Sequence, residues 1–431
     1  MELKKIKEIF SFEKGSLQSS KCTAGEYNFI TASSEWKTHN SFDYDCEALV
    51  VAVAASGSLG RVHYVNDKFI SSDLCFILKP KDSSRFAINL EFYYSIFKSL
   101  KEDLVKSTAT GTAKKSINKT NFGNYVIPYY NIKEQNRLKP VFEKVADNSE
   151  KIKQELSNQK QLVSKLKQAI LQEAIQGKLT QEWREKNLKI EPASELLERI
   201  KSEKEQLLKD KKVRKGKRQQ SNDLGNFILE IPNEWEYPEL DDISIYITDG
   251  THQTPTYTEK GRMFLSAQNV KPFKFMPEKH KYVSEKAYQG YINNRKTEKG
   301  DLLLGRVGAG IGETAVVDQD LNFAIYVSLG LVKTFKEDIE PNYLAIVFNS
   351  PYGILYAKGN ISSKGGSAGN FNLGRIRSFP IPFPPLEEQK AIVEKVETLM
   401  KKCNALELEI SQSEQHANML MQPVLKEAFQ N

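Results

Sequence analysis

Two long stretches of the chain place hydrophobic residues with the 3.5-residue period of a coiled coil. In the first stretch these positions are Leu138, Phe142, Val145, Ile152, Leu156, Val163, Leu166 and Ile170, with Ser149 and Gln159 as polar interruptions. In the second they are Ile392, Val396, Leu399, Cys403, Leu406, Ile410, Ala417, Leu420 and Val424. Such positions fall on one face of a helix, so the pattern predicts two long helices that pair with each other as an antiparallel coiled coil. Two ordinary amphipathic core helices are the alternative. Pro140 predicts a late start or a kink in the first helix, and Pro423 a kink near the end of the second.

The two helical stretches are copies of one sequence, offset by 254 residues. Residues 166–176 share six identities with residues 420–430, where composition alone would give about one. The same offset, without a gap, aligns Gln135 with Gln389. A repeat of this length predicts two copies of one supersecondary unit and therefore a pseudo-twofold molecule.

Ahead of each helix lies a segment with a different pattern. Short runs of Phe, Tyr, Val and Ile, separated by Gly, Asn, Ser and Pro, predict strands in Ala48–Ala55, Phe69–Leu78, Asp301–Leu304 and Phe323–Val332. Phe69–Lys79 aligns without a gap onto Phe323–Lys333, and Asn121 with its neighbours resembles the segment at Asn372. We therefore expect two mixed α/β heads of the same fold.

The expected domain order alternates heads and helices. It is a head at 1–131, a helix at 132–177, a charged linker with a short helix at 178–225, a head at 226–385 and a helix at 386–431. Within the linker, Ala193–Lys209 has the apolar spacing of a short amphipathic helix. Lys211–Gln220 lacks that spacing and is predicted to be a solvated linker.

Composition narrows the class of protein. The net charge is +7, and nine basic against three acidic residues between Lys201 and Arg218 account for +6 of it. A nucleic-acid-binding face on the heads must therefore come from locally placed Lys and Arg. The longest uncharged apolar run, Ala48–Ala55, is too short to span a membrane, and the N-terminus has no apolar signal segment. Four widely spaced cysteines show no metal or disulfide pattern. A cytoplasmic protein without a membrane partner is expected.

Residue constellations for catalysis are missing from the sequence. The run Gly308–Thr314 resembles a phosphate-binding loop but lacks its lysine, so a tight turn between strands is the better interpretation. The five histidines are scattered, and no Asn-Pro-Pro-aromatic tetrapeptide for a flipped base occurs. We predict a non-catalytic chain that holds no metal or cofactor itself.

Polar loops in both heads carry the side chains that contact nucleic acids. Arg and Lys hydrogen-bond to guanine, Asn and Gln to adenine, and Ser and Thr to either base, while all of them also contact phosphates. The candidate DNA-contacting residues are Arg61, Ser107, Thr110, Lys114 and Lys115 in the first head, and Gln253, Gln268, Asn269, Lys271, Arg306, Ser363, Lys364 and Ser367 in the second.

Two motifs carry a family resemblance. Phe379-Pro-Ile-Pro-Phe-Pro-Pro-Leu-Glu-Glu-Gln-Lys-Ala-Ile-Val393 resembles the junction between target-recognition domain and conserved helix in Type I restriction-modification specificity subunits. Val126–Gln135 is a weaker version with fewer prolines, and Gln176–Trp183 is similar to that family's central conserved region. The resemblance covers essentially the whole chain, although no Gly-Lys-Leu run follows the second helix.

The resemblance implies a DNA-recognition subunit whose two heads each read one half of a bipartite double-stranded target. Its helices would hold the heads apart and dock the methyltransferase subunits, which the restriction (translocase) subunits join. S-adenosylmethionine, ATP and magnesium would belong to those partners. A tandem DNA-binding adaptor for another effector and a coiled-coil scaffold without a DNA role are the alternatives.

Overall fold

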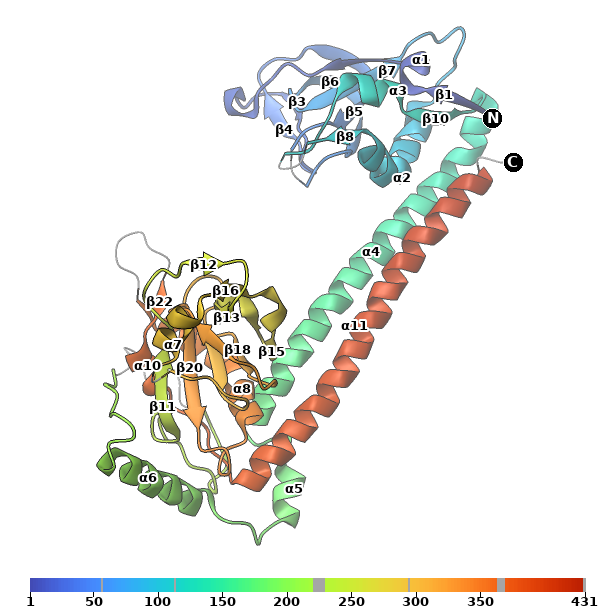
Figure 1. Ribbon diagram of the computed structural model, residues 1–431. Helices are drawn as coiled ribbons and strands as arrows, with labels where there is room; N and C mark the ends of the chain where they lie inside the picture. Colours follow the sequence, from blue (N-terminus) through green and yellow to red (C-terminus); the bar gives the residue numbers. More distant parts are fainter. Residues whose placement is uncertain (56, 112–113, 220–228, 294, 363–368, 429–431) are drawn as a thin grey trace. The chain divides into compact units, whose positions relative to one another are not determined.

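The structure is a computed structural model of residues 1–431, and it describes all of them except 56, 112–113, 220–228, 294, 363–368 and 429–431. The chain forms two compact units (Figure 1). Unit 1 comprises residues 1–160 and 408–431, and unit 2 comprises residues 161–407. Each unit therefore contains one head and a stretch of both long helices.

The head of unit 1 is built on a six-stranded sheet with the order β2-β7-β5-β6-β3-β4. Its strands are β1 (Glu2–Lys5), β2 (Phe10–Lys14), β3 (Tyr27–Ile30), β4 (Lys37–His39), β5 (Tyr44–Ala52), β6 (Val62–Ser71), β7 (Cys75–Pro80), β8 (Ala109–Thr110), β9 (Ser116–Ile117) and β10 (Val126–Tyr129). Its helices are α1 (Ile6–Ile9), α2 (Leu90–Thr108) and α3 (Lys119–Asn124). The architecture is the mixed α/β class that the sequence predicts.

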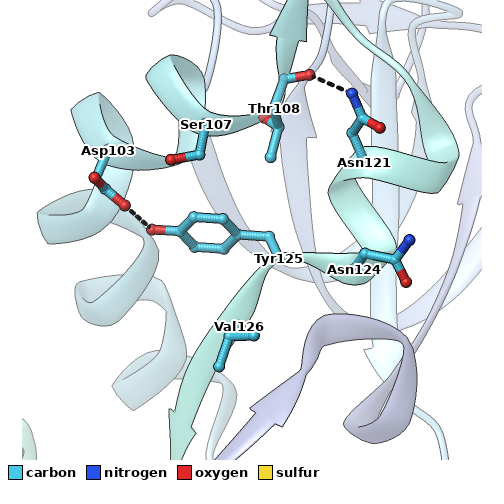
Figure 2. Close-up of a pocket in the computed structure, with 7 residues that line it drawn as sticks. All are labelled: Asp103, Ser107, Thr108, Asn121, Asn124, Tyr125 and Val126. Carbon is cyan, nitrogen blue, oxygen red and sulfur yellow. Dashed lines mark hydrogen bonds between the residues drawn. The ribbon is translucent and has the colours of Figure 1, made fainter.

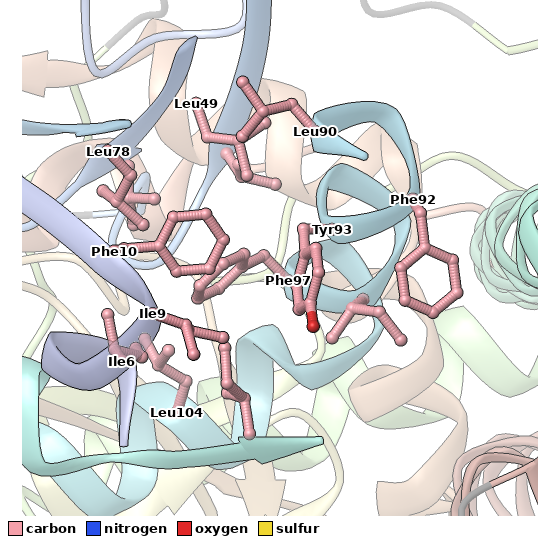
Figure 3. Close-up of a cluster of buried hydrophobic side chains, with 14 of the residues drawn as sticks. Ile6, Ile9, Phe10, Leu49, Leu78, Leu90, Phe92, Tyr93, Phe97 and Leu104 are labelled. Carbon is pink, nitrogen blue, oxygen red and sulfur yellow. The ribbon is translucent and has the colours of Figure 1, made fainter. Parts of the chain in front are cut away.

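The main core of this head lies between α2 and the sheet (Figure 3). Phe10 from β2 packs edge-to-face on Tyr93 from α2, with ring centroids 5.3 Å apart. The first turns of the long helix α4 (Ile132–Ile175) join the same core, because Phe142 packs at right angles on Phe92 at 5.6 Å. The helix thus leaves the first head from a buried, fixed base.

The head of unit 2 contains two four-stranded sheets, with the orders β11-β20-β17-β18 and β12-β16-β13-β19. Its strands are β11 (Ser244–Asp249), β12 (Tyr257–Thr258), β13 (Arg262–Leu265), β14 (Val270–Lys271), β15 (Lys274–Phe275), β16 (Lys281–Val283), β17 (Leu302–Gly305), β18 (Thr314–Val316), β19 (Phe323–Ile325), β20 (Leu329–Thr334), β21 (Ile361–Ser362) and β22 (Asn370–Phe371). Its helices are α7 (Glu285–Ile292), α8 (Pro341–Asn349), α9 (Pro351–Gly359) and α10 (Leu373–Arg377).

The two heads use the same strand pairings. The parallel pair of β3 and β6 sets Phe29 opposite Ile70, and the parallel pair of β13 and β19 sets Phe264 opposite Ala324. Ile70 and Ala324 are 254 residues apart, as the alignment of Phe69–Lys79 with Phe323–Lys333 requires. β7 and β20 likewise begin and end 254 residues apart. The prediction that Phe69–Leu78 and Phe323–Val332 are single strands is wrong, because each run contains parts of two strands with a turn between them.

One detail of the sequence alignment is wrong. Ile117 donates its backbone N–H to Val53, and Phe371 donates to Arg306 at the matching strand position, which makes Asn118 the counterpart of Asn372. Both of these asparagines cap the following short helix through their side chains. Asn121, which the alignment pairs with Asn372, lies inside α3 instead.

The long helices differ in part from their prediction. α4 begins at Ile132 and continues through Pro140, so the late start is wrong, while a kink there stays a prediction. α11 (Leu386–Ala428) continues through Pro423, and the kink expected near that residue also stays a prediction. Among the described residues, the buried apolar positions of both helices are Leu138, Phe142, Leu156, Val163, Ile170, Leu171, Ala174 and Ile175 in α4, and Ile392, Val396, Cys403 and Ile410 in α11. The predicted seam residues Ile152, Leu166 and Leu406 are 47%, 46% and 43% exposed, so they are not buried as the seam requires. The side chains of Val145, Ser149, Leu420 and Val424 lie outside the described residues.

The segment between α4 and the second head contains α5 (Gln181–Lys186) and α6 (Ala193–Lys209). The amphipathic helix predicted at Ala193–Lys209 is confirmed with its bounds, and Ala193, Leu196, Leu197 and Ile200 are its buried face. The chain after α6 is not a free linker, since Arg218 and Gln219 bind the second head. None of the helices in the described part of the chain combines the length and hydropathy that crossing a bilayer requires.

Candidate nucleic-acid interface

In the first head, a short hairpin gathers four of the five predicted DNA contacts. β8 and β9 pair across a turn that needs glycine at position 111, where φ is +103° and a Cβ would meet the Lys114 carbonyl oxygen at 2.5 Å. Ser107 is the second-to-last residue of the preceding helix α2, and Thr110 lies in β8. Ser107, Thr110, Lys114 and Lys115 are all exposed, so the hairpin presents donors to solvent.

A polar pocket of about 540 Å³ opens beside this hairpin, between α2 and α3 (Figure 2). Its lining residues are Asp103, Ser107, Thr108, Asn121, Asn124, Tyr125 and Val126. The Tyr125 hydroxyl donates to Asp103 at 2.7 Å, and the Asn121 amide donates to the Thr108 carbonyl at 3.2 Å. Burial, and then the Asp103 carboxylate, raise the pKa of Tyr125, which therefore stays a neutral donor at physiological pH.

A second pocket, of about 500 Å³, is basic. Lys101, Lys106 and Lys115 line it together with the glycine turn at residues 57–60, and its one acidic residue, Glu102, pairs with Lys153 at 2.8 Å. Gly60 takes a φ of +76° against the side chain of Val105, which brings the turn onto α2. Arg61 follows this turn but is half-buried and donates to the Ala32 carbonyl at 3.4 Å. The pocket can hold a phosphate group by charge.

Sequence reasoning missed Lys101 and Lys106. Both lie in the second half of α2, and the sequence of a helix does not indicate that a glycine turn packs beside it. The usable signal was the basic spacing of Lys98, Lys101 and Lys106 toward a helix C-terminus, which faces the loop holding Lys115.

In the second head, three predicted contacts are exposed. Gln253 follows β11, and its backbone N–H donates to the Thr251 hydroxyl at 3.2 Å. The Gln268 amide donates weakly to the Lys279 carbonyl at 3.4 Å. Lys271 forms an ion pair with Glu313 at 3.0 Å, and its side chain stays half exposed. These residues retain donors and acceptors for a ligand.

Two other predicted contacts in the second head have structural roles instead. Asn269 is fully buried, accepts from the Ser266 N–H at 2.9 Å and donates to the Met276 carbonyl at 2.9 Å. Arg306 is 4% exposed and bonds Asp249 and the carbonyl of Phe371. Burial lowers the pKa of Arg306, although Asp249 opposes this effect. The hydrogen-bonding groups of Asn269 and Arg306 are thus used inside the head, so neither residue presents them to DNA as predicted. Ser363, Lys364 and Ser367 lie outside the described residues.

The junction between head and helix is locked by the same buried glutamine in both copies. The Gln135 amide donates to the Tyr130 carbonyl at 2.6 Å, and its oxygen accepts from the Asn89 N–H at 2.7 Å. Gln389 repeats both contacts with the Pro384 carbonyl at 3.0 Å and the Glu340 N–H at 3.0 Å. The offset identity in the sequence marked these residues but not their role.

The glutamate before each of these glutamines, Glu134 or Glu388, has a different environment in the two copies. Glu388 is fully buried and accepts from the Thr180 hydroxyl at 2.7 Å, from Arg184 and from the Trp235 indole at 2.8 Å. Gly177, with φ +68°, brings this segment in, and a Cβ there would lie 2.6 Å from Pro232. The segment Gln176–Trp183 thus packs onto the second junction between head and helix through contacts within this chain.

No metal centre accompanies these surfaces within the described residues, where no group of three or more His, Cys, Asp or Glu side chains could hold an ion. Such an arrangement of exposed donors has the chemistry that suits an anionic, hydrogen-bonding polymer.

Two α/β heads with exposed polar loops, each leading into a long helix, define a class of two-headed helical proteins. Residues 1–181 and 232–413 match the family model of the Type I restriction modification DNA specificity domain. The chain belongs to this family.

Curated relatives agree with the family. The chain is 30% identical over 256 residues to the specificity subunit of the Type I restriction enzyme EcoAI from Escherichia coli, an alignment that spans 57% of this chain and 41% of that subunit. It is 22% identical to the EcoDI specificity subunit of Escherichia coli over 98% of this chain and 86% of the relative. The alignments with EcoAI and with the EcoEI subunit of Escherichia coli thus span less than half of each relative's length.

A solved structure shows the same fold. A chain described under the heading of complex assembly and conformational transition of the type I R-M system matches with a TM-score of 0.60 and 15% identity, over 99% of this chain and 97% of that one.

Proposed function

We propose that this chain is the DNA sequence-recognition subunit of a Type I restriction-modification complex and has no catalytic activity of its own. The observation that carries the proposal is the pair of heads with matching strand registers but different exposed donors. A shared scaffold with divergent loops suits the recognition of two different half-sites in double-stranded DNA. Family membership supports the same conclusion.

The two helices serve in this proposal as an antiparallel coiled-coil spacer within a pseudo-twofold repeat. In unit 1, Lys160 of α4 pairs with Glu414 of α11 at 2.6 Å. In unit 2, Lys167 pairs with Glu407 at 2.7 Å. Partners whose numbers rise along one helix as they fall along the other are those of an antiparallel pair.

The exposed apolar side chains of the helices supply a surface for protein partners. Val141, Ile152, Leu162, Leu166, Leu406 and Leu408 are 43–62% exposed. We assign this surface to methyltransferase subunits, with restriction subunits joining that assembly. S-adenosylmethionine, ATP and magnesium belong to those partners, and the complex works in the cytoplasm. The heading of the solved relative, which names type I R-M complex assembly, supports a partner-dependent role.

The experiment that tests the proposal is single-molecule sequencing of methylated bases in cells with and without this chain. Loss of the chain should abolish methylation at one bipartite motif and leave every other methylated motif unchanged. Unaltered methylation at all motifs would contradict the proposal. Co-purification of a methyltransferase with the chain distinguishes a restriction-modification subunit from a DNA-binding adaptor for another effector.

A further inference from the structure

The chain that follows α6 carries a dense run of positive charge. We call residues 211–217 the basic strap, and its charged residues are Lys211, Lys212, Arg214, Lys215 and Lys217, all exposed. Both ends of the basic strap are fixed to the second head by the contacts described below.

The C-terminal end of the strap is fixed by an acidic site on the second head. Arg218 pairs with Glu239 at 2.8 Å, Asp241 at 3.2 Å and Asp242 at 2.5 Å. The next residue, Gln219, donates its N–H to the Gly374 carbonyl of α10 at 3.2 Å. A solvated linker would make no such set of contacts.

Arg377 of α10 adds a contact inside the strap. Its guanidinium donates to the Lys217 carbonyl at 3.3 Å and to the Ile247 carbonyl of β11 at 2.6 Å. Gly216 passes so close that a Cβ there would lie 2.2 Å from Arg377 Nε. The backbone of the strap is thereby pressed against the head, and its side chains remain outside.

The N-terminal end of the strap is fixed by α6. Leu196 and Ile200 are fully buried, and Lys204 forms an ion pair with Asp241 at 3.5 Å. Asp241 therefore joins both anchors, because it also receives Arg218. After α6 the chain runs toward α10 (Figure 1).

The anchors leave the charge of the strap unneutralised. Among the described residues, Lys211, Arg214, Lys215 and Lys217 have no acidic partner, while Lys212 pairs with Asp210 at 3.3 Å. Arg377, which holds the strap, also contacts β11, the strand that precedes the exposed candidate residue Gln253.

We propose that the basic strap is a DNA-backbone clamp that binds phosphates beside the second half-site without reading sequence. The inference rests on the proposed function, since it assumes that the second head binds duplex DNA. Six residue steps span at most about 20 Å at about 3.3 Å per residue. That length covers about six phosphates of one strand at about 3.4 Å along the helix axis, enough for each basic side chain of the strap to reach one phosphate.

The test is the salt dependence of DNA binding by the full chain. Lys211→Gln, Arg214→Gln and Lys215→Gln are combined in one variant, and Lys186→Gln, Lys189→Gln and Lys201→Gln form a charge-matched control outside the strap. Binding is measured from 50 to 300 mM salt on two duplexes, one carrying the chain's methylation motif and one without it.

Removal of three phosphate contacts should lower the slope of log affinity against log salt by about 2.7, because each contact contributes about 0.9. The loss should be equal on both duplexes, the control should keep the wild-type slope, and the methylated motif in cells should stay the same. An unchanged slope in a strap variant that still prefers its motif would overturn the clamp and leave the proposed function intact. Loss of methyltransferase association without a change in slope would overturn it in favour of a protein contact. A wild-type chain that does not prefer its motif would contradict the proposed function itself, and the clamp with it.

Discussion

Replacing Glu388 with alanine should release the segment that follows α4 from the second junction. The Glu388 carboxylate is fully buried and receives Thr180, Arg184 and the Trp235 indole. Its removal strands the Arg184 guanidinium, whose side chain is only 17% exposed, and two neutral donors. Breaking a buried ion pair by deleting one partner costs about 3–5 kcal/mol. The local opening equilibrium should therefore rise at least about a hundredfold, since about 1.4 kcal/mol corresponds to a factor of ten.

Hydrogen exchange of the full chain measures this opening directly. Amides in residues 177–186 should lose protection in Glu388→Ala, whereas those of the first head should not change. Glu388→Gln keeps an acceptor oxygen and should fall between wild type and alanine. A global unfolding curve is less informative, because chains with several domains do not follow two-state unfolding.

The chain supplies its own control at the position 254 residues earlier. Glu134 pairs with Arg137 one helical turn away, and the two side chains are 36% and 61% exposed, in contrast to the fully buried Glu388. Exposed pairs of this kind contribute little, so Glu134→Ala should leave exchange nearly unchanged. Equal effects of the two substitutions, or none for Glu388→Ala, would refute the account of the junction.

Three further predictions follow from the described contacts. Ile170→Asp should reduce the hydrogen-exchange protection of α4, because the Ile170 side chain is only 6% exposed. Leu166→Asp, at a 46% exposed position, should leave that protection unchanged, and equal protection in both variants would contradict the pairing of the two long helices. Lys115→Ala should weaken binding evenly across sequences and lower the salt slope by about one if it contacts phosphate, and Lys114→Ala should cost about 1–3 kcal/mol at one base position if it reaches a guanine edge; identical behaviour of the two would disprove separate roles. Burial, and then Arg61, lower the pKa of His63, so the folded first head favours the neutral histidine. The stability of the head should therefore be full above pH about 6.5 and fall as the pH drops below that value. His63→Asn should weaken this pH dependence when hydrogen exchange is compared at pH 7.5 and 5.5.

The sequence allowed prediction of features that depend on local pattern. The α6 helix at Ala193–Lys209 and the aligned runs ending at Lys79 and Lys333 follow from apolar spacing and from the repeat. The long helices were also predicted, but not which of their apolar residues are buried: Ile152 and Leu166 fit the heptad yet are 47% and 46% exposed.

Features that depend on distant segments could not be predicted. Arg306 lies between a strand and a glycine-rich turn, a position typical of an exposed loop residue. Its side chain is nevertheless buried, because it bonds Asp249 and the Phe371 carbonyl, which come from other parts of the head. Asn269 similarly resembles a loop donor while it closes a short turn inside the core. The basic strap was visible as a charge run, but its anchors on Asp241 and Arg377 come from residues far along the chain.

The central claim is that the two heads read two half-sites independently. Its most direct test replaces residues 1–131 with the first head of a homologous specificity subunit and determines the methylated motif in cells by single-molecule sequencing. The account predicts that one half of the bipartite motif changes to that of the donor subunit while the other half stays the same. A motif that changes in both halves, or in neither, would contradict it.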